Sequence, residues 1–199
     1  MPKRTPTTAQ QLMQQLAADP EWVARHAQME QLRAATSEDL RHDEAPLIAA
    51  LHKAGVNVNS VWDLVNMPAP YPFALPVLAA HLDRPYAPRN LEGIARALAV
   101  KEARAFAWEK VWELVTNRWP ELAEDFRAGL MTALSGMATA DDLPKMISLI
   151  TDRRYGPSRV LIVSNLTRSR RKEARQALLD LKTDPDLQKE IAYRLKTSI

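Results

Sequence analysis

The chain contains no cysteine and only five glycines among its 199 residues. The lack of cysteine excludes disulfides, thiolate metal ligands and a cysteine nucleophile. So few glycines disfavour an all-β fold, which needs many tight turns, and favour a helical one. No apolar run approaches the roughly 18 residues that a membrane span requires, and the first residues, MPKRTPTTAQ, are polar. These features predict an all-α, cytoplasmic protein without a membrane segment.

Motifs of the common enzyme classes are also missing. There is no glycine-rich phosphate loop, G-x-S-x-G turn or dinucleotide fingerprint, and the histidines have no metal-ligand spacing. We therefore predict no catalytic residue, no metal and no cofactor. An acidic run surrounds His42 and comprises Glu38, Asp39, Asp43 and Glu44. It has two interpretations, which are a solvated helix face and a site for a cation or for acid–base chemistry.

A repeated pattern organises the second part of the chain. An apolar residue followed by leucine four positions later recurs at intervals of about 29 to 36 residues. Residues four apart share one helix face, so each copy presents the same apolar pair to its neighbours. We expect these pairs to be buried on second helices of helical hairpins: Ile94 and Leu98, Leu130 and Leu134, Ile162 and Leu166, Ile191 and Leu195.

Each pair is preceded by another helical pattern and a proline-containing corner. The first helices are predicted in LPVLAAHL, WEKVWELV, LPKMISLI and ARQALLDL. The corners LDRPYAPR, ITDRRYGPS and LKTDPDLQ place Asp and Pro where one helix ends and the next begins. The copy that begins at Trp108 has a longer connection, TNRWPELAEDF, which predicts a short extra turn or a mobile loop.

This pattern resembles HEAT-type repeats, including their lyase-like variety. The resemblance rests on LPVLAAHLDRPYAPRNLEGIARALAV and LPKMISLITDRRYGPSRVLIVSNL and covers about residue 72 to the C-terminus. It implies a HEAT-like α-solenoid of about four helical hairpins, whose second helices line a concave face. Proteins built this way mostly bind other macromolecules. By analogy with the lyase-like variety alone, a third function class is a lyase or maturation factor for a tetrapyrrole pigment.

The first 70 residues follow a different pattern. A short helix stopped near Pro20 precedes a longer, highly charged stretch with a thin apolar stripe. Pro46 fits the first turn of a further helix that ends at Gly55, and Ser60 is a candidate N-cap. We therefore predict one domain, with residues 1–70 as an N-terminal helical arm and cap packed on the repeats of residues 71–199.

Trp108 and Trp112 lie four residues apart beside two glutamates, Glu109 and Glu113. HEAT-like alkylpurine DNA glycosylases use aromatic and carboxylate side chains to handle damaged bases, and this group of residues resembles theirs. The motif of that family is not matched residue by residue. The simpler interpretation is that both rings face the helical core.

Basic residues concentrate between Arg153 and Arg175, although the net charge is only +3. Corners of neighbouring hairpins align along one edge, which would join Arg84 and Arg89 to Arg153, Arg154 and Arg159. Arg168, Arg170 and Arg171 would lie at the opposite end of their helix. Guanidinium groups suit carboxylates and phosphates equally.

Together these features predict a non-catalytic scaffold or adaptor that binds a protein partner, one with an acidic surface. The alternative is a nucleic-acid-binding protein, including a glycosylase-like enzyme. The five edge arginines are the predicted contacts in either case. A third interpretation is a solvated basic edge with no dedicated partner. The oligomeric state is left open.

Overall fold

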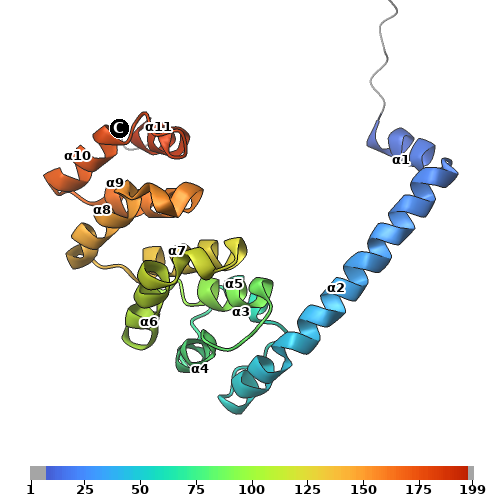
Figure 1. Cartoon of the computed structure of the whole chain (residues 1–199). Helices are drawn as coiled ribbons and strands as arrows, with labels where there is room; N and C mark the ends of the chain where they lie inside the picture. The colour runs from blue at the N-terminus through green and yellow to red at the C-terminus, as the bar shows by residue number, and fades with distance from the viewer. Residues whose placement is uncertain (1–7, 197–199) are drawn as a thin grey trace, which may run out of the picture. The chain divides into compact units, whose positions relative to one another are not determined.

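The structure, a computed structural model, describes residues 8–196, so most of the polar start lies outside the described range. Within this range every element is an α-helix or a short 3-10 helix, and there is no strand (Figure 1). The prediction of an all-α fold is confirmed. None of the described helices is both long enough and apolar enough to cross a bilayer.

The chain divides into two compact units, Met1–His42 and Asp43–Ile199. This boundary falls well before residue 70, where the sequence pattern changes. Residues 43–70 belong with the hairpins because their apolar side chains enter the same core; Leu47, Leu51, Val58, Val61 and Leu64 are at most 4% exposed.

The first unit holds α1 (Ala9–Ala17) and the beginning of α2 (Pro20–Lys53). Its thin apolar stripe stays exposed: Val23, Met29 and Leu32 keep 45%, 51% and 56% of their surface. The predicted new helix at Pro46 is wrong, because α2 runs through this proline without a break. Pro46 lacks the N–H that would donate to the His42 carbonyl, but both residues lie on the exposed side of the helix. Burial of Leu47 on the other side favours helix continuation.

The second unit has helices at the positions predicted for the repeats. Their first helices are α4 (Ala74–His81), α6 (Arg104–Asn117), α8 (Leu143–Thr151) and α10 (Lys172–Asp180). Their second helices are α5 (Pro88–Ala97), α7 (Glu124–Met137), α9 (Val163–Arg168) with the preceding 3-10 segment η4 (Arg153–Ile162), and α11 (Gln188–Lys196). The short α3 (Val61–Val65) precedes them, and Ser60 caps it as predicted.

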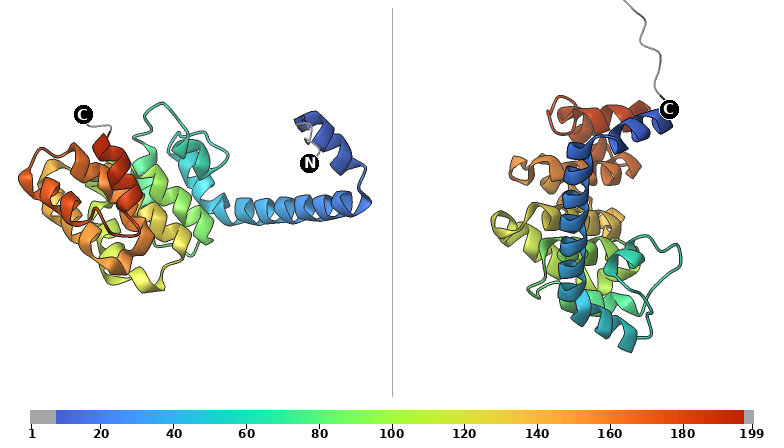
Figure 2. Two further views of the ribbon diagram at one scale, coloured as in Figure 1. Left: turned by 90° about the horizontal axis from the view of Figure 1, so that it is seen from above. Right: turned by 90° about the vertical axis from the view of Figure 1, so that its right-hand side faces the viewer.

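The hairpins pack in chain order (Figure 1, Figure 2). Each second helix contacts the next along the chain: α3 with α5, α5 with α7, α7 with η4, and α9 with α11. Among the first helices, α4 contacts α6 and α8 contacts α10. The longer connection after α6 holds the expected extra turn, η2 (Trp119–Glu121). The Tyr-Gly-Pro corner depends on Gly156, whose φ of 53° lies in the left-handed region that glycine tolerates best.

Seven of the eight predicted core residues are at most 1% exposed: Ile94, Leu98, Leu130, Leu134, Ile162, Leu166 and Ile191. The prediction is wrong for Leu195, which is 38% exposed. This leucine lies on α11, the last described helix.

Two glycines allow the second helices to approach closely. A Cβ on Gly93 would lie 2.6 Å from Val61 Cγ1, and a Cβ on Gly129 would lie 3.0 Å from the Glu92 carbonyl oxygen. Both positions precede an apolar pair by one residue, so the repeated glycine has a packing role. It sets the spacing of α3, α5 and α7.

Two acidic residues within α2, Asp43 and Glu44, cap two other helices. Glu44 Oε2 accepts hydrogen bonds from Ser60 Oγ at 3.2 Å and from the Val61 amide at 3.0 Å, at the start of α3. Asp43 Oδ2 accepts from the Ala87 amide at 2.8 Å, at the start of α5. Helix N-termini carry free amides and partial positive charge, so carboxylates there stabilise the fold. Asp43 and Glu44 therefore have a structural role.

Replacing Glu44 with alanine is expected to lower the free energy of unfolding by about 1 to 3 kcal/mol, because a buried amide loses its acceptor. Glu38→Ala is the matched control, since that side chain is 70% exposed. It should stay within about 0.5 kcal/mol of the wild type. Urea denaturation followed by circular dichroism measures both, and equal losses would contradict the capping role.

Candidate functional site

Four of the five predicted edge arginines are exposed at the corners between first and second helices. Arg84 lies in the corner between α4 and α5, and Arg89 lies in the first turn of α5. Arg153 and Arg154 follow α8. The fifth, Arg159, is 1% exposed.

Carboxylates lie beside three of these exposed arginines, and two of the three pairs are close. Arg89 Nη1 lies 2.6 Å from Glu92 Oε2, and its guanidinium also stacks 3.9 Å from the centre of the Trp62 ring. Arg154 Nε lies 2.7 Å from Asp152 Oδ2. Arg153 Nε lies 3.7 Å from Asp184 Oδ2. An arginine already paired with a carboxylate within its own chain has less charge to offer a partner.

Arg84 lies beside a buried polar pair, His81 and Tyr86, whose Nδ1 and hydroxyl are 2.7 Å apart. Burial lowers the pKa of His81, and the positive charge of Arg84 lowers it further. The imidazole is therefore held neutral at physiological pH.

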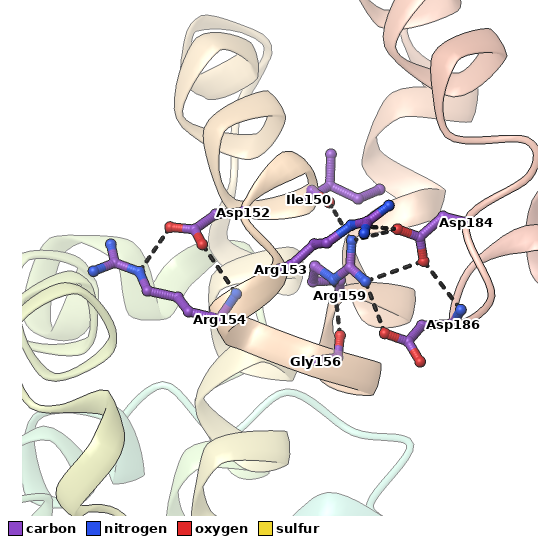
Figure 3. A network of polar contacts seen from close by, with 8 residues as sticks. All are labelled: Ile150, Asp152, Arg153, Arg154, Gly156, Arg159, Asp184 and Asp186. Atoms are coloured by element: carbon purple, nitrogen blue, oxygen red, sulfur yellow. Dashed lines mark hydrogen bonds and ion pairs between the residues drawn. The ribbon is translucent and has the colours of Figure 1, made fainter.

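Arg159 is the centre of a buried network (Figure 3). Its guanidinium donates to both carboxylate oxygens of Asp184, at 3.1 and 3.0 Å, and to Asp186 Oδ2 at 2.8 Å. The remaining donors reach the carbonyl oxygens of Gly156 at 2.9 Å and Ile150 at 3.2 Å. All five guanidinium donors are thereby satisfied. Arg159 joins η4 to the connection between α10 and α11, which corrects its prediction as a surface contact.

Two buried carboxyls link stability to pH. Hydrogen bonds from Arg159 lower the pKa of Asp184 below its ordinary 3.8, against the opposing effect of burial. At Asp142 burial raises the pKa, but hydrogen bonds from Thr139 and Arg104 outweigh it and leave the pKa lowered. A carboxyl with a lowered folded pKa stabilises the fold above its unfolded pKa. That stabilisation is lost as the pH falls through the folded value.

We expect the free energy of unfolding contributed by these carboxyls to be level above about pH 5 and to fall below about pH 4. Urea titrations at successive pH values measure this. Asp184→Asn should lower stability at neutral pH and flatten the acidic slope. Asp141→Asn should change neither, because the Asp141 side chain is 96% exposed. An unaltered acidic slope in Asp184→Asn would contradict the assignment.

The other part of the basic stretch lines a groove of about 790 Å³. Arg168 is the last residue of α9, and Arg170 and Arg171 follow this helix. They line the groove together with Lys101, which begins the 3-10 segment η1 (Lys101–Ala103) after α5. We call this the basic groove. Part of its lining is tied together across α7 and α9, where Asn165 Nδ2 donates to the Ser135 carbonyl at 2.9 Å.

Most of the cations in the basic groove have no carboxylate partner. In the described part of the chain, Lys101, Arg168 and Arg170 form no ion pair, and Arg168 Nε donates to the Ser164 carbonyl. Arg171 lies 3.7 Å from Asp141, a weak contact because that carboxylate is almost fully in solvent. The sequence analysis placed these arginines at the opposite end of their helix from the edge arginines. It did not predict that they would line a groove together with Lys101. One sequence clue was that both groups lie near the C-terminal ends of predicted second helices.

Two further grooves adjoin the basic groove. One of about 870 Å³ lies between α8 and α10, has Pro144, Ile147 and Ala177 in its lining, and shares Leu143 and Arg171 with the basic groove. We call it the apolar groove. The other, of about 660 Å³, is lined by the proline-rich connection before α4 and shares Ala99, Val100 and Glu102 with the basic groove. The three grooves are therefore neighbours on the second unit.

The tryptophan pair packs within the helices. Trp108 is 3% exposed, and its ring stacks on Trp112 with centres 6.2 Å apart. Arg104 covers Trp108 at 4.1 Å from the ring centre, and Lys145 lies over both rings. Core packing of Trp108 is confirmed, and this ring is not available to stack on a nucleobase.

No family model, curated protein or solved structure matches the chain in the comparisons. Among the described residues, no group of three or more histidine, aspartate or glutamate side chains is arranged to hold a metal ion.

Proposed function

We propose that this chain is a cytoplasmic, non-catalytic HEAT-like α-solenoid that acts as a scaffold or adaptor by binding a partner protein. The observation that carries the proposal is the set of three neighbouring grooves, which share lining residues. Successive hairpins add grooves side by side, and extended binding surfaces of this kind are what helical repeat proteins use.

The chemistry of this surface also supports a protein partner. It combines apolar side chains from α8 and α10 with arginines and a lysine at the helix ends. Protein interfaces place apolar groups at their centre and favour arginine among the charged residues. A surface with only cations would favour phosphate, whereas this mixture suits a polypeptide.

Affinity capture from the native host, with and without nuclease treatment, tests the proposal. We expect the same partner protein in both samples and a stoichiometric complex when the two purified proteins are mixed. Size-exclusion chromatography with light scattering measures that stoichiometry. Capture of nucleic acid alone, or a protein that fails to bind once purified, would contradict the proposal.

A second candidate function is nucleic-acid binding, and the unpaired cations of the basic groove favour it. Phosphate contacts release counterions, so such binding weakens steeply as the salt concentration rises. The net charge of +3 is small for this role. We expect negligible binding to random duplex DNA at physiological salt. Submicromolar, strongly salt-dependent binding would favour this second function over the first.

A further inference from the structure

We propose that the basic and apolar grooves together bind an acidic segment of a partner protein, one that carries an apolar anchor residue beside its carboxylates. This inference rests on the proposed function and assigns its binding site. It also replaces the predicted contacts, since the site contains none of the five edge arginines.

The charge of the basic groove points to a carboxylate-rich ligand. Four cations, Lys101, Arg168, Arg170 and Arg171, line it against a single acid, Glu102. Elsewhere on the second unit, Arg89 is paired closely with Glu92 and Arg154 with Asp152. The planar guanidinium matches a carboxylate through two parallel hydrogen bonds, which gives an acidic segment a defined register.

The apolar groove supplies the second half of the site. It begins at Leu143 and Arg171, which it shares with the basic groove, and continues over Ile147 and Ala177. Ile147 is only half-buried within the chain, so its remaining surface can pack against a ligand. An apolar side chain that follows the acidic residues of a segment would enter here and remove this surface from water.

The same groove disfavours a nucleic acid. Glu173 and Asp180 balance Arg171 and Lys172 in its lining, so a phosphate backbone that continued from the basic groove would meet no net positive charge there. A polypeptide can place carboxylates in one groove and an uncharged side chain in the next. Charge complementarity therefore selects an acidic segment with a neutral, apolar end.

A phage-displayed library of random peptides of about twelve residues, a length typical of peptide-recognition sites, tests this inference on the full chain. We expect the enriched peptides to combine aspartate or glutamate with leucine, isoleucine or phenylalanine. Fluorescence anisotropy then measures the affinity of one labelled peptide, and a version with lysine in place of its acids should not bind. Enrichment without an acidic bias would overturn the inference.

Paired variants locate the binding site. Arg168→Gln with Arg170→Gln removes two cations from the basic groove and should weaken binding about tenfold or more. Arg153→Gln with Arg154→Gln removes the same charge outside both grooves and should have little effect. Ile147→Ser should weaken the anchored peptide and leave a fully acidic analogue unchanged. Thermal melts followed by circular dichroism confirm that each variant folds.

The outcomes separate this inference from the proposed function. Equal loss in both arginine pairs, or no effect of Arg168→Gln with Arg170→Gln, would overturn the groove assignment, while a captured and reconstituted partner would still support the adaptor. Duplex DNA that binds at physiological salt and is lost only in the groove variant would replace the peptide by a nucleic acid. If no peptide is enriched and no partner is captured, both proposals fail.

Discussion

Replacing Arg159 with alanine is expected to lower the free energy of unfolding by about 3 to 5 kcal/mol, because the change leaves a buried charge without its partner. Asp184, at 5% exposure, would keep a carboxylate whose two oxygens now accept hydrogen bonds from this arginine. The connection between α10 and α11 would also lose its contact with η4. Urea denaturation at neutral pH, followed by far-UV circular dichroism, measures the loss.

Arg154→Ala is the matched control for Arg159→Ala. It removes the same side chain five residues earlier, where the guanidinium is 58% exposed beside Asp152. Its effect should stay within about 0.5 kcal/mol. Arg159→Met combined with Asp184→Leu removes both charges and should recover much of the loss. Equal losses in Arg159→Ala and Arg154→Ala would show that the buried network is not a structural link.

Replacing Leu134 with alanine is expected to cost about 2 to 5 kcal/mol of unfolding free energy, because the change opens a cavity among packed helices. Leu134 is fully buried on α7, and this helix packs against both α5 and η4. Neighbours on both sides limit how far the site can collapse around the missing atoms. Chemical denaturation gives the size of the loss.

Leu195→Ala is the control at the corresponding position of the last hairpin. Leu195 is 38% exposed on α11, so its truncation should cost less than about 1 kcal/mol. A similar cost at both positions would mean that the last hairpin is packed as tightly as the middle ones. A small cost at Leu134 would contradict its place in a shared core.

Features set by short-range patterns were predicted correctly from the sequence. The first helices of the hairpins, the Ser60 cap and the Gly55 stop are observed where the residues indicated. Seven of the eight core residues followed from the spacing of apolar pairs. These features depend on which side chains share a helix face and on local backbone preferences, which a sequence displays directly.

Features set by distant neighbours were not predicted. Local rules end a helix before Pro46, yet α2 continues because burial of Leu47 and capping by Asp43 and Glu44 favour it. The exposure of Leu195 depends on whether another helix packs over α11. The sequence alone allowed two interpretations of the acidic run beside His42. The contacts of Glu44 with α3 and of Asp43 with α5 showed that these two carboxylates cap helices.

The arginines show the same division most clearly. By itself, the sequence determined that the chain is helical, that an apolar pair recurs along its second part, and that basic residues gather between Arg153 and Arg175. The tertiary structure alone decided that Arg159 is buried against Asp184, that Arg154 is paired locally, and that Arg168 meets Lys101 around a groove. The physical reason is that the effective charge of a side chain depends on burial and on its partners, and packing brings these from distant positions in the chain.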